Sequence, residues 1–188
     1  MDKKEKNILV LVWIFIVLIV FAVGYLYYYW YDKEEQQREH DFMQIYLPEK
    51  AVCSIERWSG YYDLDKWLIF NTIMTESNGD QYAKSHANCK GYMQVGKTTA
   101  QTARERIYPL IKWRMYNIYN TDINIATGCL LLRTLIDHYT GDDEKLTAEV
   151  YNTGWYNYNK RKYRAPKHVK RYLLNKTAFK SAYKKFRR

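Results

Sequence analysis

The fold is decided by residues 64–77, which read Leu64-Asp65-Lys66-Trp67-Leu68-Ile69-Phe70-Asn71-Thr72-Ile73-Met74-Thr75-Glu76-Ser77. Apolar side chains recur at spacings of three and four on two faces of this stretch, a pattern typical of a helix buried on most sides. Asp63 or Asp65 can cap its start, and Gly79-Asp80 can end it. Glu76 stands out because it is a carboxylic acid near the end of an otherwise apolar helix.

The sequence farther along the chain also predicts helices. Asp122 begins a long segment whose apolar residues repeat at spacings of four and three, and Gly141 ends it. Pro166 suits the first turn of a last helix. Because we find no convincing run of alternating polar and apolar residues, the expected fold class is mainly α.

The N-terminal part of the chain predicts a membrane span. Ile8 to Trp30 contains no charged residue, and a helix of that length, roughly 35 Å, crosses a hydrocarbon core. Tyrosine and tryptophan crowd its C-terminal end, where amphipathic rings suit a lipid–water interface. Two alternatives are a buried core helix and a signal peptide cleaved near Ala22-Val23-Gly24.

The positions of charged residues predict how the chain is divided. Three lysines before the span (Lys3, Lys4 and Lys6) favour a short cytoplasmic tail over residues 1–7. The expected order is then a transmembrane helix over 8–30, a juxtamembrane stalk over 31–60, a helical domain over 61–156 and a basic helical tail over 157–188. Everything after the span would lie on the extracytoplasmic side, in the periplasm or the cell wall.

The net charge of +10 is concentrated at the C-terminus. From Trp155 to Arg188 there are 13 Lys and Arg residues and no Asp or Glu. Such a tail can bind anionic wall polymers or lipid headgroups, or it can be a solvated surface with no dedicated partner. Nucleic acid is an unlikely ligand outside the cytoplasm.

Three motifs carry the candidate chemistry. Burial disfavours the charged form of a carboxylic acid, so a buried Glu76 would hold its proton near neutral pH, as a general acid must. The alternative is an exposed glutamate at a helix end. Two later motifs, Gly91-Tyr92-Met93-Gln94 and Val150-Tyr151-Asn152-Thr153-Gly154, place amides and a phenol where they could orient the acid or a sugar.

Together these motifs resemble the lytic transglycosylase domain of the soluble lytic murein transglycosylase type, which is related to goose-type lysozyme. That family has Glu-Ser at a helix end, then Gly-Leu-Met-Gln, then Ala-Tyr-Asn-x-Gly. The resemblance covers roughly Asp63 to Trp155, and Tyr92 and Val150 depart from the family's usual Leu and Ala. It implies a lysozyme-like helical domain behind the N-terminal span.

The resemblance also implies a reaction. Such enzymes cleave the β-1,4 bond between N-acetylmuramic acid and N-acetylglucosamine in peptidoglycan and leave a 1,6-anhydromuramic end. One glutamate serves first as acid and then as base, which in this chain would be Glu76. The residues that would contact the glycan are Ser77, Met93, Gln94, Tyr151 and Asn152. No cofactor and no metal are expected.

Three other functions compete with this reading. A lysozyme-type hydrolase needs a second carboxylate to activate water, for which Asp63, Asp80 and Asp122 qualify by residue type. A non-catalytic module that binds peptidoglycan could keep the same fold. Residues 91–98 also satisfy the phosphate-loop pattern G-x-x-x-x-G-K-[ST], but the polar residues before them predict no strand, so we expect no nucleotide.

The chain has three cysteines, Cys53, Cys89 and Cys129. Cys129 lies on the apolar stripe of its helix, which favours a buried thiol. In an oxidising compartment the remaining two could pair, so we predict a Cys53–Cys89 disulfide.

Overall fold

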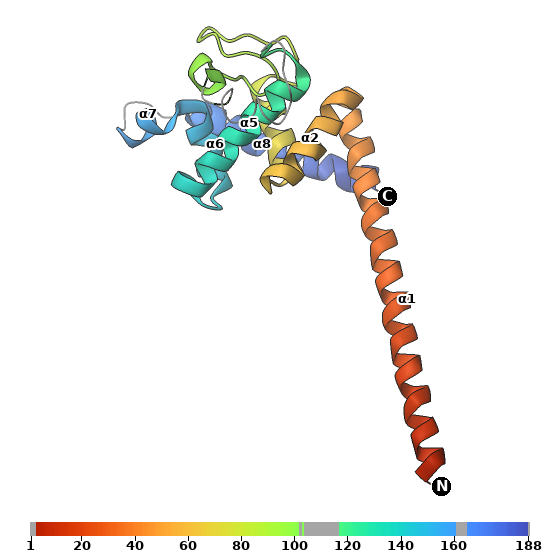
Figure 1. The fold of residues 1–188 in the computed structure, drawn as a ribbon. Coiled ribbons are helices and arrows are strands. Elements are labelled where there is room, and N and C mark those ends of the chain that lie inside the picture. The colour runs from red at the N-terminus through yellow and green to blue at the C-terminus, as the bar shows by residue number, and fades with distance from the viewer. Residues whose placement is uncertain (1–2, 102, 104–116, 161–164, 188) are drawn as a thin grey trace. The chain divides into compact units, whose positions relative to one another are not determined.

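The computed structural model describes residues 3–101, 103, 117–160 and 165–187. The chain divides into two compact units, Met1–Asp41 and Phe42–Arg188. The described elements are α1 (Lys3–Gln44), α2 (Glu49–Tyr62), α3 (Lys66–Glu76), α5 (Thr121–Leu135), the π-helical turn η1 (Ile136–Thr140), α6 (Glu144–Thr153), α7 (Trp155–Asn159) and α8 (Pro166–Phe186), shown in Figure 1. Among the described residues only isolated bridges of Lys90 with Lys84 and Val95 are strand-like, so the mainly α prediction is confirmed.

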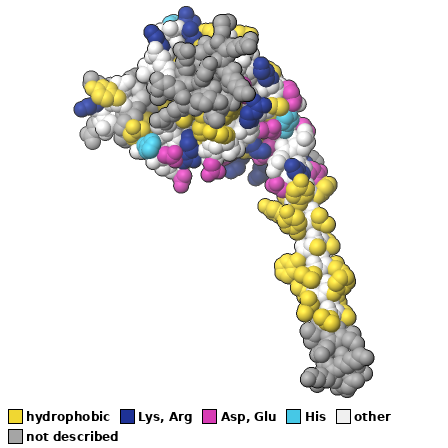
Figure 2. All heavy atoms as spheres, in the orientation of Figure 1, with side chains coloured by type: hydrophobic (Ala, Val, Ile, Leu, Met, Phe, Trp, Pro, Cys, Tyr) yellow, Lys and Arg dark blue, Asp and Glu magenta, His cyan; other side chains and the backbone are white. Residues whose placement is uncertain are grey.

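The first unit consists of helical turns of α1. The segment Leu11–Gln44 is long and apolar enough to cross a membrane by length and composition. Hydrophobic side chains cover most of the apolar stretch of this helix on the face seen in Figure 2. The helix forms because nothing in the run breaks it, and in lipid every backbone amide must find its partner within the helix.

Helix α3 lies at the centre of the second unit. Its start is fixed by Asp65, whose side chain accepts a 2.8 Å hydrogen bond from the Trp67 amide. Every residue from Leu68 to Thr75 is buried, as the apolar pattern on two faces predicts. Burial on all sides leaves little freedom for the residues at its C-terminal end, where Glu76 lies.

Helix α2 packs on α5 through a polar contact at the end of the core. Asp122 accepts hydrogen bonds from Ser54 Oγ at 2.9 Å, Trp58 Nε1 at 2.9 Å and Arg57 NH1 at 3.1 Å. Ala51, Val52 and Ile55 of α2 are completely buried. Part of the segment predicted as a stalk over 31–60 therefore belongs to the compact unit, because one face of α2 is apolar.

Helix α8 is also part of this unit. The sequence alone predicts residues 157–188 to be a basic tail outside the domain. In the structure Val169 and Tyr172 are buried in α8, and the Tyr172 hydroxyl donates to Glu144 on α6. Several lysines of the helix, among them Lys167, Lys170 and Lys180, remain exposed, so a strongly charged sequence and a packed helix coexist.

The three cysteines are free thiols in the structure, so the predicted Cys53–Cys89 disulfide is wrong here. Cys53 Sγ donates to Glu49 Oε1 at 3.3 Å within α2, whereas Cys89 lies in the loop after α3, close to Gly96. Cys129 is completely buried on α5, as its apolar stripe predicts. Burial raises the pKa of its thiol, which makes it a packing residue.

Candidate functional site

Glu76 is the last residue of α3, and the chain turns away directly after it. Ser77 ends the helix, and its Oγ donates to the Ile73 carbonyl at 3.1 Å. Asn78 and Gly79 then both have a positive φ, of 55° and 78°. This sharp exit holds the Glu76 side chain at the helix end instead of letting the helix carry on past it.

The Glu76 carboxyl group is enclosed by protein. Its side chain is 9% exposed, and its Oε1 lies 3.3 Å from Nε2 of His168 on α8, whose side chain is 15% exposed. Oε1 is buried and has no hydrogen-bond partner among the residues that the structure describes, so the histidine contact is close without having hydrogen-bond geometry. Farther along α8, Arg171 donates to the Met74 carbonyl at 3.4 Å, and Asn175 donates to Thr75 at 3.2 Å.

This enclosure changes the acidity of Glu76. Burial raises its pKa from 4.5 to about 7, against the opposing effect of the positive charge of Arg171. Burial, reinforced by Arg171, also lowers the pKa of His168 to about 4. At neutral pH the pair therefore consists of a carboxyl group that holds its proton for a large part of the time and a neutral imidazole. A carboxyl group in this state can protonate a leaving oxygen.

The loop Gly91–Gln94 is fixed to α5 by one buried amide. Asn124 accepts a 2.8 Å hydrogen bond from the Met93 amide and donates to the carbonyls of Lys90 and Ile118, each at 2.9 Å. Gly91 is required here because its φ is 77° and a Cβ atom would lie 2.2 Å from Asn124 Nδ2. The loop therefore has little freedom where it approaches α5.

Tyr151 connects this loop with the surroundings of Glu76. Its hydroxyl donates to the Met93 carbonyl at 2.9 Å. Its pKa is raised well above 10 by burial and, secondly, by the charge of Glu76, so the phenol stays neutral. Tyr151 therefore binds the loop to α6 as a neutral hydrogen-bond donor.

The predicted substrate-contacting residues are not all arranged as the motif suggests. The side chain of Met93 is completely buried and fits over Gly128, where a Cβ atom would lie 2.2 Å from its sulfur. Gln94 Nε2 donates to the carbonyls of Ala83 and Gly91, at 3.1 and 3.0 Å. Met93 and Gln94 therefore hold the loop in shape, and Asn152 is exposed near the end of α6.

Sequence reasoning missed the residues that α8 contributes. His168 and Arg171 lie in the stretch predicted as a basic tail, yet they are the charged or titratable groups that face Glu76 from α8. The spacing of Val169 and Tyr172, three residues apart after Pro166, is the signal that could have revealed a packed helix. The excess of positive charge in this stretch favoured the interpretation as an exposed tail.

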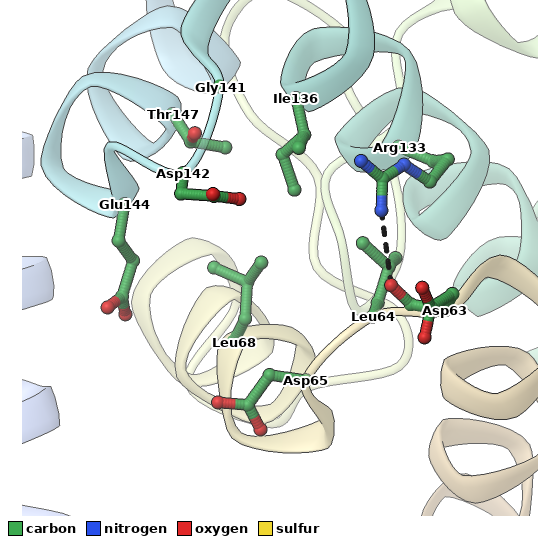
Figure 3. Close-up of a pocket in the computed structure, with 10 residues that line it drawn as sticks. All are labelled: Asp63, Leu64, Asp65, Leu68, Arg133, Ile136, Gly141, Asp142, Glu144 and Thr147. Carbon is green, nitrogen blue, oxygen red and sulfur yellow. Dashed lines mark hydrogen bonds between the residues drawn. The ribbon is translucent and has the colours of Figure 1, made fainter.

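The three candidates for a second carboxylate have other surroundings. Asp122 is held by α2, as described above, and Asp80 Oδ1 accepts a 2.8 Å hydrogen bond from the Tyr82 amide. Asp63 lines a pocket of about 210 Å³ together with Asp65, Arg133, Asp142 and Glu144 (Figure 3). In that view Arg133 donates to the Asp63 carbonyl at 3.1 Å. Glu76 is not among the residues that line this pocket.

The amides of the segment that matches the phosphate-loop pattern are already used within the protein. The Met93 amide donates to Asn124, the Gln94 amide to the Gly91 carbonyl at 3.1 Å, and the Val95 amide to the Lys90 carbonyl at 2.9 Å. A phosphate cradle needs such amides free and converging on the anion. The geometry of this loop serves its attachment to α5 instead.

Comparisons with known proteins agree with these motifs. Residues 54–174 match the transglycosylase SLT domain. The membrane-bound lytic murein transglycosylase C of Histophilus somni (strain 2336) is 33% identical over 118 residues, covering 59% of this chain and 31% of that protein. Its counterpart from Sodalis glossinidius is 32% identical over 106 residues, covering 54% of this chain and 29% of that protein. The chain thus spans less than a third of the length of these relatives.

A solved structure shares the fold. An inactive mutant of the lytic transglycosylase Slt from Pseudomonas aeruginosa superposes with a TM-score of 0.60 and 17% sequence identity, over 74% of this chain and 25% of that one. At this identity the likeness concerns the fold alone. The match to the domain includes α3, the Gly91–Gln94 loop, α5, α6 and the first part of α8, as far as Leu174. The chain therefore belongs to the transglycosylase SLT domain family.

Proposed function

We propose that this protein is a membrane-anchored lytic transglycosylase of peptidoglycan. Glu76 would protonate the oxygen of the β-1,4 bond between N-acetylmuramic acid and N-acetylglucosamine, and the bond to the muramic C1 would break. The resulting carboxylate would then take the proton of the muramic C6 hydroxyl as that oxygen closes the 1,6-anhydro ring. The proton count balances without water as a nucleophile.

The observation that supports this proposal is the state of Glu76. Its carboxyl group is buried at the end of α3 with a pKa of about 7, so acid and base forms are both accessible near neutral pH. One group that must donate and later accept a proton works best with such a pKa. The surroundings of Asp122, which three donors on α2 occupy, do not favour it as a partner that activates water.

Anchoring would come from α1. In this proposal residues 1–7 remain in the cytoplasm, residues 8–30 span the bilayer and the helical unit acts on the far side, in the periplasm or cell wall. The candidate span Leu11–Gln44 supports it, as do the lysines that precede the apolar run. The relatives from Histophilus somni and Sodalis glossinidius are named as membrane-bound enzymes.

The exposed face of α8 would supply a second, weaker attachment. Lys167, Lys170, Lys180, Lys184 and Lys185 are exposed on it. Positive charges on one helix attract anionic wall polymers and anionic lipid headgroups alike, at about 1 kcal/mol per residue near a lipid surface. Binding to vesicles with and without anionic lipid, and to purified wall polymer, separates the two ligands.

The experiment that tests the function is a digest of purified peptidoglycan by the full chain in detergent, read by mass spectrometry. Anhydro-ended muropeptides support the transglycosylase, whereas reducing ends would indicate a hydrolase and the absence of products a binding module. Glu76→Gln should abolish cleavage, because an amide of similar shape has no labile proton to give. Glu149→Gln, the same change on α6, is the matched control and should cleave at the parent's rate.

A further inference from the structure

The proposed function leaves one close contact of the site unused. His168 Nε2 lies 3.3 Å from Glu76 Oε1, and both side chains are mostly buried. The histidine is held there by its helix, since Val169 next to it and Tyr172 farther along are buried in the core. Burial of a histidine costs free energy that an exposed histidine avoids, so the position of His168 beside the acid calls for a physical reason.

The chemistry of Glu76 gives a reason for the position of His168. Between its two roles the carboxylate must exist in a site where the described part of the chain gives its Oε1 no hydrogen-bond partner. A buried charge without a partner is costly, and a single hydrogen bond from a neighbouring N–H removes much of the cost. A neutral imidazole carries one N–H and one lone pair, so at Nε2 it can donate to the carboxylate or accept from the protonated acid, according to its tautomer.

We propose that His168 is a positioning residue for Glu76. His168 orients the carboxyl group and donates a hydrogen bond to its ionised form. The proposal rests on the function proposed above. In each turnover the proton passes from Glu76 to the glycosidic oxygen and returns to Glu76 from the C6 hydroxyl. His168 gives up no proton overall and stabilises the state between the two transfers.

The other charged or titratable groups around Glu76 do not replace this role. Arg171 on the same helix favours the carboxylate through its charge but donates to the Met74 carbonyl. Tyr151 on α6 donates to the Met93 carbonyl. The charge of Cys89 in the loop contributes to the raised pKa of Tyr151. His168 is the group that the structure places against Oε1 itself.

The test is the pH dependence of kcat/KM on peptidoglycan for the full chain in detergent. His168→Phe keeps much of the ring volume and removes both nitrogen atoms, whereas His168→Gln keeps an N–H and an acceptor at similar reach. We expect His168→Phe to lower kcat about tenfold. The alkaline limb of the pH–rate profile, where activity falls as Glu76 loses its proton, should move up by about one pH unit, because a carboxylate without its donor binds its proton more tightly. His168→Gln should restore most of kcat and return the limb toward its original position.

A merely structural role predicts a different result. Both variants would then lose activity in proportion to the fall in their thermal unfolding temperature, with the alkaline limb unmoved, and this outcome would overturn the proposal. His138→Phe, a change at an exposed histidine of η1, is the control and should leave rate and limb unchanged. If His168→Phe fails to fold, His168→Leu replaces it in the same comparison.

A second readout keeps this proposal separate from the proposed function. The pKa of Glu76 can be followed by NMR of its labelled carboxyl carbon in the full chain, with Glu76→Gln to assign the signal. A rise of about one unit in His168→Phe supports the pairing even if no anhydro product forms. An unchanged titration would refute the pairing even in an enzyme that makes anhydro products.

Discussion

The hydroxyl of Tyr151 donates a 2.9 Å hydrogen bond to the backbone carbonyl of Met93. This bond joins α6 to the loop that α5 holds from the other side through Asn124. Two of the three motifs, the Gly91–Gln94 loop and the end of α6, thus meet at the Met93 carbonyl, and the Tyr151 phenol contributes an uncharged hydroxyl. The contribution of this hydroxyl to stability and activity can therefore be measured by removing its oxygen atom.

Tyr151→Phe should weaken the enzyme without inactivating it. The change leaves the Met93 carbonyl without its partner and costs about 1 kcal/mol of stability, while the ring keeps its packing. We expect a lower unfolding temperature and reduced cleavage with some activity left. Tyr82→Phe, at a side chain that is 70% exposed, is the control. Full activity in Tyr151→Phe would mean that the loop is held well enough by Asn124 alone.

Glu76→Gln should stabilise the protein at alkaline pH as it abolishes activity. Folded Glu76 keeps its proton up to a pH of about 7, whereas its ordinary pKa is 4.5. Below pH 4.5 both states are protonated, and stability is lost as the pH rises toward and through 7. At pH 8 the loss amounts to on the order of 3 kcal/mol. Unfolding temperatures of parent and variant measured from pH 5 to 8 should therefore diverge as the pH rises. Parallel curves would show that burial does not perturb this acid.

Gly128→Ala should destabilise the contact between α5 and the loop. A Cβ atom at this position would lie 2.2 Å from Met93 Sδ and 2.7 Å from Met93 Cβ, and overpacking of this kind costs about 1–3 kcal/mol. The second substitution Met93→Ala should recover part of the loss, because it removes the clashing atoms. Gly60→Ala on α2, where no atom of the described residues lies within 4 Å of the added carbon, serves as control and should stabilise slightly. Equal effects at the two glycines would contradict the packing described here.

The three thiols should titrate as free in the unfolded protein. In the folded protein we expect Cys53 and Cys89 to react with an alkylating reagent well before Cys129, which is buried on α5 and has a raised pKa. Mass spectrometry of the alkylated chain reports the order. A titre of one thiol per unfolded chain would instead support the Cys53–Cys89 disulfide that the sequence predicts.

The sequence contains most of what is needed to predict the helices but not their assembly. The burial of α3 follows from apolar residues on two of its faces, and the position of Glu76 at its end follows from Gly79. The contribution of α8 does not follow, because hydrophobic spacing and positive charge point to opposite environments for the same residues. Burial of Val169 and Tyr172 decided the outcome, since their apolar surface could be removed from water while the lysines remained exposed.

The motifs themselves were easier to find than to interpret. Met93 and Gln94 recur in the expected place, yet their side chains serve the loop, which a linear pattern cannot reveal. His168 belongs to no motif, and its contact with Glu76 joins residues far apart in the chain. A contact of this kind depends on how α8 packs along α3, which is determined by tertiary packing and not by local spacing.

The packing of α8 against α3 has a consequence for truncated forms of the protein. A chain cut before Pro166 would still contain Glu76, the Gly91–Gln94 loop and Tyr151, so that any search by motif would accept it. It would lack the helix whose His168 lies against the carboxyl group, and a Glu76 more open to water would have a pKa closer to the ordinary value of a glutamate. Loss of α8 would therefore weaken Glu76 as a general acid without changing a single residue of the motifs.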